Sequence, residues 1–425
     1  MTFVEWKIWF RLLPLSMKWF VVLILLRPII DLFYFLKNVS PVLSPLYIVG
    51  VLTPIVIFIS FFSKRFPKKF KSISIDLTFG LWGSLLGINL LIYFMYYFSV
   101  GTIAEVIKYV TPLFLFFYLR NFISHKRNLI GLLQAFYYSA SIPLFLLIYE
   151  LLIGPINPEY LTESRGGEAR IQGGYADIMN YAIYITGALI FKLYTYLGDF
   201  KLKKLTAKRL TTTALVLLFC FIGLSAIKQT ASWGVFFAIM VIFLFFNLRN
   251  RITLGLIVLF LPVILYAGFM TYESRVEPLI RKEFRVLEGE REARFLLNGR
   301  VSRWLSVFDE WQEMNVLCKL FGTSFSGSPN LPYLLSGAMH SDYIRMIFLT
   351  GIIGLILYLL IYLNLIKRAL SLKGRDRFLL LSSIAATLLF SVSTNPLLYA
   401  PYLYFVFPIF AYASLPKSVL RKQHV

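Results

Sequence analysis

The chain has 425 residues, of which 58% are hydrophobic, 17% aromatic and 15% charged, and its formal net charge is +22. A water-soluble protein of this composition would lack the polar side chains needed to cover its surface, so a soluble globular enzyme is excluded and an all-α polytopic membrane protein is predicted. The positive charge would favour nucleic acid in a soluble protein, but here its placement along the chain decides its meaning.

Twelve apolar runs are long enough to form membrane-spanning helices. Each must be helical, because lipid offers no partner to an unpaired backbone group. Their approximate limits are 18–36, 46–63, 76–97, 103–119, 128–152, 175–196, 211–227, 231–247, 252–270, 343–366, 378–394 and 398–415.

Basic residues cluster at both termini and in alternate connections, the pattern that marks the cytoplasmic side of a membrane protein. With twelve spans, all seven clusters fall on one side, so we expect cytoplasmic termini and a multi-pass protein of the lipid bilayer. The excess charge is then a topology signal, and no nucleic-acid partner is expected. The clusters lie at 7–18, 64–71, 120–127, 201–209, 249–251, 367–377 and 417–422.

Two connections on the opposite side are long enough to carry an activity. Residues 153–174 form a short polar loop, and residues 271–342 form a long one with nearly balanced charges. We therefore divide the chain into helices one to nine (1–270), a mostly helical extracytoplasmic catalytic loop between helices 9 and 10 (271–342), and helices ten to twelve with a basic tail (343–425).

The two cysteines, Cys220 and Cys318, lie in different environments and predict no disulfide.

Two features near the end of the long loop bear on packing. Residues 301–314 predict a helix, with Trp304, Leu305, Phe308 and Trp311 on its apolar side. In the run that follows the loop, Gly351 and Gly354 lie three residues apart, so another helix could approach them on one face.

His340 ends the long loop and is one of three histidines. With Ser341 and Asp342 beside it, a neutral imidazole near the membrane surface can act as a general base on a hydroxyl. Asp342 would orient the ring and favour the imidazolium that forms. The structural alternative is an interfacial histidine that is hydrogen-bonded to the backbone.

If the predicted 301–314 helix includes Arg300, then Arg300, Arg303 and Trp304 share one face, and both guanidinium groups can converge beside the indole ring. Guanidinium groups match phosphate oxygens in a bidentate manner, so the pair predicts a diphosphate or glycan contact. The alternative is a solvated face on which Arg303 pairs with Asp309 or Glu310.

Two further cations are candidates for the same ligand. Lys228 lies in a very short connection without an adjacent carboxylate, and Arg170 ends the first polar loop. Each predicts an anion contact, with interfacial snorkelling of Lys228 and pairing of Arg170 with Asp177 as the alternatives.

Arg27 and Asp31 lie within the first apolar run at the spacing of one helical turn. Two opposite charges in lipid neutralise each other, so we interpret them as a structural intramembrane pair. No clustered His, Cys, Asp or Glu spacing indicates a metal site.

Taken together, these motifs resemble those of the O-antigen ligase and O-antigen polymerase superfamily. His340-Ser341, followed by Gly351-Ile352-Ile353-Gly354, is similar to the family's histidine and Gly-x-x-Gly elements. Asn298-Gly299-Arg300 with Trp304 is similar to its Gly-Arg element, and Arg170-Ile171-Gln172-Gly173-Gly174 with Asn180 resembles the start of its mid-chain helix. The chain departs from the pattern at Lys228-Gln229, where the family commonly has Ser-Arg.

The resemblance implies a glycosyltransferase of a bacterial inner membrane that needs no metal or other cofactor. Its donor is an undecaprenyl-diphosphate-linked glycan, held by arginines, and the histidine activates the acceptor hydroxyl. The acceptor is another lipid-linked glycan in a polymerase and the lipid A core in a ligase, and a chain-length regulator protein is left open as a further partner. We favour the polymerase type; the alternatives are the ligase and a transporter or flippase of lipid-linked sugars.

Overall fold

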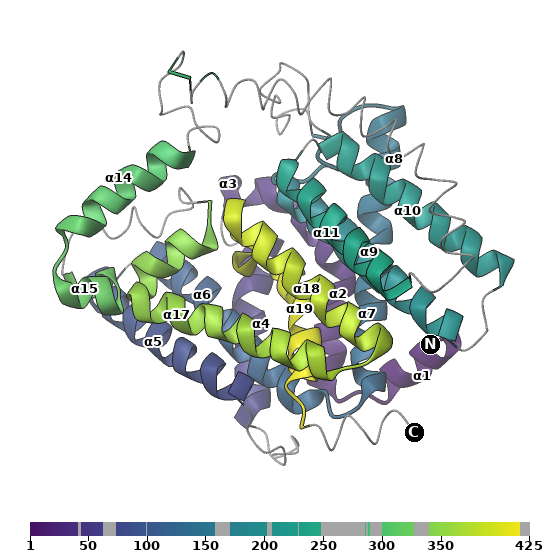
Figure 1. Ribbon diagram of the computed structural model, residues 1–425, viewed down its shortest axis with the longest axis horizontal. Helices are drawn as coiled ribbons and strands as arrows, with labels where there is room; N and C mark the ends of the chain where they lie inside the picture. The colour runs from purple at the N-terminus through teal and green to yellow at the C-terminus, as the bar shows by residue number, and fades with distance from the viewer. Residues whose placement is uncertain are drawn as a thin grey trace.

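The computed structural model describes residues 1–40, 44–62, 74–98, 100–157, 171–201, 206–227, 229–247, 285, 288–289, 300–326 and 340–416. Across these residues the regular elements are helices and no strand occurs, so the chain is an all-α protein (Figure 1). Helices occupy eleven of the twelve predicted apolar runs, and the run at 252–270 lies outside the described residues.

The first half of the chain forms a succession of helices. They are α1 (Phe3–Arg11), α2 (Leu15–Leu32), η1 (Phe33–Phe35), α3 (Leu36–Val39), α4 (Pro45–Phe62), α5 (Ser74–Tyr96), α6 (Val100–Phe122), α7 (Lys126–Ser139), α8 (Ser141–Leu152) and α9 (Ile178–Lys201).

The second half continues the bundle and adds the described part of the long loop. Its elements are α10 (Ala207–Ile227), α11 (Thr230–Asn247), α14 (Arg300–Glu313), α15 (Val316–Phe321), η5 (Thr323–Ser326), α17 (Asp342–Ser371), α18 (Gly374–Ser393), η7 (Pro396–Leu398) and α19 (Ala400–Ala413).

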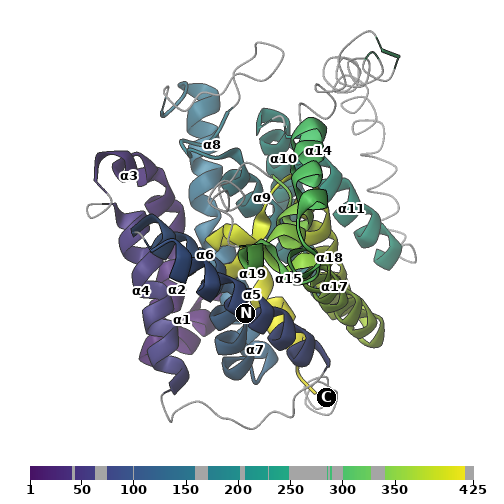
Figure 2. The ribbon, with the colours of Figure 1, turned by 90° about the vertical axis from the view of Figure 1, so that its left-hand side faces the viewer.

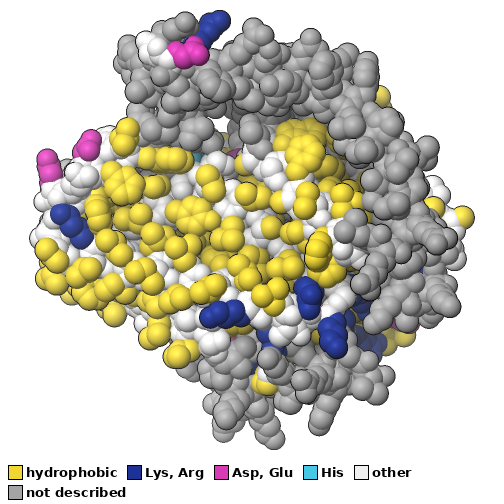
Figure 3. Space-filling model, in the orientation of Figure 1, with side chains coloured by type: hydrophobic (Ala, Val, Ile, Leu, Met, Phe, Trp, Pro, Cys, Tyr) yellow, Lys and Arg dark blue, Asp and Glu magenta, His cyan; other side chains and the backbone are white. Residues whose placement is uncertain are grey.

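The surface of the bundle is that of a membrane-embedded protein. Among the described residues, five helical segments are long and apolar enough to span a membrane, and large apolar side chains on many helices are exposed. Figure 3 shows a broad apolar band on one face, with lysine and arginine side chains gathered along its lower edge. Such a continuous apolar surface suits contact with lipid rather than with water. The five segments are Ser74–Tyr96, Lys126–Leu152, Arg209–Ile227, Asp342–Ser371 and Gly374–Ser393.

The bundle is built around α19, which lies among the other helices in both ribbon views (Figures 1 and 2). Its residues from Pro401 to Ala413 are all buried, and it packs against α6, α7 and α9. A helix that is apolar on every side belongs inside a bundle. Ring contacts position it: Tyr404 meets Phe20 of α2 edge-on at 5.2 Å between ring centroids, and Phe405 meets Phe136 of α7 at a tilt, with 5.1 Å between centroids.

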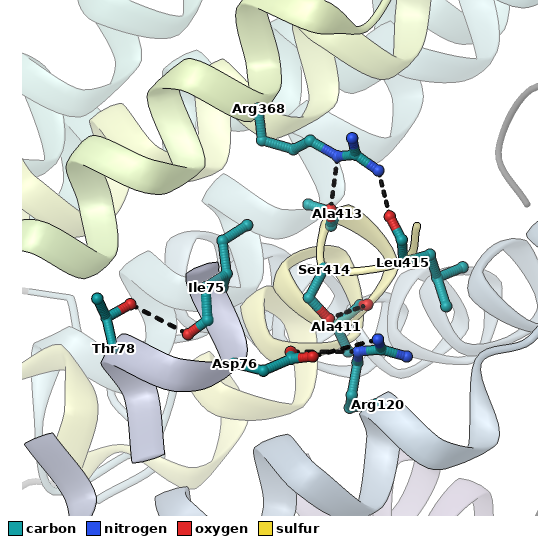
Figure 4. A network of polar contacts seen from close by, with 9 residues as sticks. All are labelled: Ile75, Asp76, Thr78, Arg120, Arg368, Ala411, Ala413, Ser414 and Leu415. Atoms are coloured by element: carbon teal, nitrogen blue, oxygen red, sulfur yellow. Dashed lines mark hydrogen bonds and ion pairs between the residues drawn. The ribbon is translucent and has the colours of Figure 1, made fainter. Parts of the chain in front are cut away.

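Ion pairs connect several helices at one end of the bundle, which we call the basic end. Arg120 of α6 lies 3.2 Å from Asp76 of α5 (Figure 4), and Lys126 of α7 lies 2.6 Å from Asp376 of α18. These residues flank the second, fourth and tenth connections along the chain. The predicted basic clusters at 64–71, 120–127 and 367–377 therefore adjoin helix ends that meet at one end of the bundle.

The other end of α17, where the long loop joins it, is the loop end. Here the predicted continuous helix is interrupted, because Gly351 adopts φ 67° and ψ −173°. The short helix α15 and the segment η5 pack into the break. Thr323 donates a hydrogen bond to the carbonyl of Phe348 at 3.0 Å, and Asn89 of α5 donates to the carbonyl of Phe321 at 2.8 Å.

The break corrects the expectation that Gly351 and Gly354 share one helical face. Gly351 instead admits the backbone of α15, since a Cβ at this position would lie 2.2 Å from the carbonyl oxygen of Leu320. At Gly354 a Cβ would lie 1.9 Å from Oγ1 of Thr350 on the same helix and 3.4 Å from a methyl group of Leu85 on α5. The glycines thus serve two different contacts, because the backbone turns between them.

We expect Gly351→Ala to destabilise the protein by about 3 kcal/mol or more, because it combines a strained positive φ with a clash against backbone. The measurement is the melting temperature of the detergent-purified protein. Gly374→Ala is the matched control: Gly374 also has a positive φ of 55°, but nothing lies within 4 Å of a Cβ there. Equal losses in the two variants would show that α15 does not depend on close approach to Gly351.

Candidate functional site

His340 stands at the junction between the long loop and α17. Its side chain is exposed, and its φ of 40° makes it the one non-glycine residue with a positive φ in the described part of the chain. Such a backbone conformation is uncommon outside glycine, although Asn, Asp and His adopt it more often than other residues, and it persists where the surrounding structure holds it in place. Ser341 follows as the N-cap residue of α17 and donates to the carbonyl of Ser391 at 3.1 Å. The imidazole is therefore accessible on a fixed segment of backbone.

Asp342 points into the protein rather than toward solvent. Its side chain is fully buried, and its Oδ2 accepts hydrogen bonds from the Ser391 hydroxyl at 3.2 Å and the backbone N–H of Leu397 at 3.5 Å. Its contacts therefore fasten α17 to the end of α18 and to η7. The structure gives this carboxylate an anchoring role, whereas the sequence had suggested that it orients the exposed imidazole of His340.

Arg345, in the second turn of α17, is the residue that the sequence analysis missed. It is 1% exposed, and none of its three guanidinium nitrogens has a hydrogen-bond partner within the described residues. Its guanidinium carbon lies 5.9 Å from the ring centroid of Tyr109. The signal in the sequence was an arginine inside an otherwise apolar run, a costly placement that marks function in membrane helices.

Asp342 and Arg345 share the same end of α17 without forming an ion pair. In the described part of the chain, no carboxylate lies within 4.0 Å of the Arg345 guanidinium, and Oδ1 of Asp342 has no hydrogen-bond partner. Burying a charge costs free energy unless the charge is paired and hydrogen-bonded, so this arrangement is unfavourable for the fold by itself. We call His340, Asp342, Arg345 and Tyr109 the loop-end site.

The helix α14 lies against the same segment of α17. Val307, Trp311 and Met314 pack on Ile344, Ile347 and Phe348. The packed face therefore includes Val307, whereas Leu305 is 55% exposed. This corrects the predicted apolar side, because successive helical residues turn by about 100° and Leu305 points away from the face that carries Val307 and Trp311.

Arg300 and Arg303 lie in the first turns of α14, and only their backbone is described. Arg300 begins the helix, about 10 Å along its axis from Val307, given a rise of about 1.5 Å per residue. Both residues are thus carried by a helix that is docked beside the start of α17. The structure does not describe the positions of their guanidinium groups.

Arg170 and Lys228 lie outside the described residues, but their neighbours meet. The N–H of Ile171 donates to the carbonyl of Ala226 at 3.4 Å, so the end of the first polar loop contacts the end of α10. Asp177, the alternative partner of Arg170, accepts from the Tyr399 hydroxyl and from the N–H of Met179 at 2.8 Å.

Glu150 holds the glycine pair that follows Arg170. The buried carboxylate accepts hydrogen bonds from the N–H groups of Gly173 at 2.6 Å and Gly174 at 2.9 Å. Both glycines have a positive φ, which allows consecutive N–H groups to point at one acceptor. Sequence reasoning passed over Glu150 because one acidic residue near the end of an apolar run has no distinguishing neighbours.

Arg27 and Asp31 do form an ion pair, with 2.8 Å between Nε and Oδ1. Both side chains are largely buried between α2 and its neighbours, which suits the structural role inferred from the sequence. The contact is an ion pair rather than a well-aligned hydrogen bond, because Nε meets no acceptor at a hydrogen-bonding angle.

The loop-end site combines an accessible imidazole with a buried guanidinium that has no hydrogen-bond acceptor among the described residues, an arrangement suited to proton transfer beside an anionic group. Among the described residues, no group of three His, Cys, Asp or Glu side chains is placed to hold a metal ion. No known family model matches the chain, and no curated protein is significantly similar to it.

Proposed function

We propose that the chain is a membrane glycosyltransferase that moves a glycan from an undecaprenyl-diphosphate-linked donor to a hydroxyl of an acceptor glycan. The observation that carries this proposal is the loop-end site, where the exposed imidazole of His340 and a guanidinium without a hydrogen-bond acceptor among the described residues, that of Arg345, belong to one helix end. An acceptor hydroxyl needs a base, and a diphosphate leaving group needs cations. The family resemblance of the loop motifs supports the same reaction.

In the proposed reaction, His340 removes the proton of the acceptor hydroxyl as its oxygen attacks the anomeric carbon of the donor sugar. A new C–O bond forms, the bond between the anomeric carbon and the diphosphate breaks, and the electron pair leaves with undecaprenyl diphosphate. Arg300 and Arg303 bind the diphosphate, with Lys228 and Arg170 as further contacts. A lysine supplies charge at position 228 without a bidentate fork.

The proposed topology has twelve spans, cytoplasmic termini and an extracytoplasmic active site in a bacterial inner membrane. It rests on the alternation of basic clusters and is supported by the pairing of Lys126 with Asp376 and of Arg120 with Asp76 at the basic end. The loop-end site then faces the side on which undecaprenyl-linked glycans are assembled into surface polymers.

Two alternatives keep the same membrane fold. A ligase would use the same residues and transfer the glycan to the lipid A core, and only the acceptor separates it from a polymerase. A transporter of lipid-linked sugars would need ionisable residues lining a path at mid-depth. Arg345 and Asp342 lie in the first two turns of α17 instead, which favours chemistry at the membrane surface over passage through the bundle.

The deciding experiment is incubation of the purified protein with a lipid-linked glycan as the sole substrate. A polymerase lengthens it into a ladder. A ligase leaves it unchanged until lipid A core is added, and then joins the glycan to that acceptor. A transporter leaves it unchanged in both conditions. His340→Ala should lower turnover by roughly 10² or more. The melting temperature should stay close to that of the unmodified protein, because the imidazole is exposed.

Asp342→Asn should lower the melting temperature as well as turnover, since the carboxylate anchors α17. Normal turnover by His340→Ala would end this mechanism.

Arg300→Lys should lose most activity with normal insertion and folding, because lysine retains the charge but not the bidentate fork. Glycan transfer and membrane yield are measured together. Lys319→Arg is a matched basic control: Lys319 donates to the carbonyl of Gln312, and its ammonium lies over Trp311 at 5.8 Å. Near-normal turnover of Arg300→Lys would reduce Arg300 to a structural residue.

The topology is tested by labelling introduced cysteines with a membrane-impermeant maleimide. The native thiols should react little with the reagent, because Cys220 and Cys318 are free but buried. Burial also raises the pKa of the Cys318 thiol. Exposed Glu313→Cys, at the end of α14, should react in intact spheroplasts. Exposed Lys373→Cys, between α17 and α18, should react only after lysis. The reverse pattern would invert the orientation.

A further inference from the structure

Two arginines on α17 are both buried, but their surroundings differ. Arg368, at the basic end, is 8% exposed and donates through Nε to the carbonyl of Ala413 at 2.8 Å and through Nη2 to the carbonyl of Leu415 (Figure 4). It joins the ends of α17 and α19. Arg345, at the loop end, is 1% exposed and has no acceptor among the described residues. The guanidinium of Arg368 therefore has a structural role. The N–H donors of Arg345 have no acceptor among the described residues.

The described residues around Arg345 hold its charge in place without neutralising it. The ring of Tyr109 faces the guanidinium, and a cation over an aromatic face is stabilised by less than an ion pair buried at the same depth. The nearest described carboxylate on α17, Asp342, is engaged by Ser391 and Leu397 through Oδ2. Its negative charge restrains the guanidinium electrostatically, but the planar fork of five N–H donors remains available to an anion.

The depth of Arg345 identifies the kind of anion. It lies three residues into α17, so it is about 5 Å along the helix axis from Asp342 and close to the end of an apolar spanning segment. Met346, Phe348 and Leu349 beside it are buried and apolar. A phosphate group at this depth would be attached to a lipid chain that continues into the apolar surroundings.

We propose that Arg345 binds the diphosphate of a polyprenyl-diphosphate lipid through bidentate N–H···O contacts, with Tyr109 behind the guanidinium. This inference rests on the proposed function for the identity of the lipid and adds a substrate-binding residue to it. A planar guanidinium matches two phosphate oxygens at once. The unused donors of Arg345 are then satisfied by the substrate, which also places the scissile bond beside the loop that ends at His340.

The test is a thermal-shift titration of the detergent-purified full-length protein. The probes are farnesyl diphosphate, farnesyl monophosphate, farnesol, inorganic pyrophosphate and phosphatidylglycerol. Farnesyl diphosphate should raise the melting temperature most, because it has both the isoprenoid chain and the diphosphate. A shift that pyrophosphate alone reproduces would mean that the site takes the free anion. A shift that phosphatidylglycerol reproduces would mean a general anionic-lipid site. Either result overturns the assignment.

Two variants of Arg345 separate a ligand-binding residue from a structural one. Arg345→Met should retain or raise the melting temperature without ligand, because it removes a buried charge that no acceptor satisfies. Its apparent affinity for farnesyl diphosphate should fall by roughly tenfold or more, the scale of losing hydrogen bonds to a charged group. Arg345→Lys, which retains the charge, should give an intermediate loss of affinity.

Arg368→Met is the matched control on the same helix. It should lower the melting temperature by several degrees, because the carbonyls of Ala413 and Leu415 lose their donors, and it should retain the farnesyl diphosphate shift. The inference is overturned if Arg345→Met loses thermal stability as Arg368→Met does, or if it binds farnesyl diphosphate as tightly as the unmodified chain. Binding that depends on Arg345 in a protein that never transfers glycan would uphold this inference and refute the proposed function instead.

Discussion

A helix that breaks in apolar surroundings must find new partners for the backbone groups that the break frees, and α17 meets this constraint at Gly351. Groups outside the helix supply these partners. The Thr323 hydroxyl donates a hydrogen bond to the carbonyl of Phe348, and the amide of Asn89 on α5 donates to the carbonyl of Phe321, the last residue of α15. Because lipid could supply neither bond, the break fixes where the long loop enters the bundle. The docking of α14 on Ile344 and Phe348 follows from the same anchoring.

The charged side chains at the two ends of the bundle differ in whether they have ion-pair or hydrogen-bond partners. At the basic end, Arg120, Lys126 and Arg368 each have a carboxylate or carbonyl acceptor. We therefore assign these residues a structural role. At the loop end, Arg345 and one oxygen of Asp342 have none within the described residues. Local rules of polar satisfaction are commonly broken at functional sites and kept elsewhere. The contrast places the candidate chemistry at one end of one helix.

Segments that are distant in sequence reach the loop end because acidic side chains bind them there. Glu150 holds Gly173 and Gly174, Asp342 holds the end of α18 and η7, and Asp177 accepts the hydroxyl of Tyr399. Hydrogen bonds to an ionised carboxylate are stronger than those between neutral groups. The central helix α19 supplies a rigid support for these loops, because it is buried on every side.

The sequence by itself determined the all-α membrane class and the positions of the helices, because apolar runs of spanning length leave the backbone only one way to pair its own groups. It also determined the Arg27–Asp31 pair, since a spacing of one helical turn is a local property. The tertiary structure decided the break at Gly351, the use of Val307 rather than Leu305 on the packed face of α14, and the inward direction of Asp342. It also decided the most informative feature, that Arg345 is buried and has no acceptor among the residues that the structure describes. Each of these depends on which distant backbone or side chain lies opposite, and the periodicity of a single segment carries no such information.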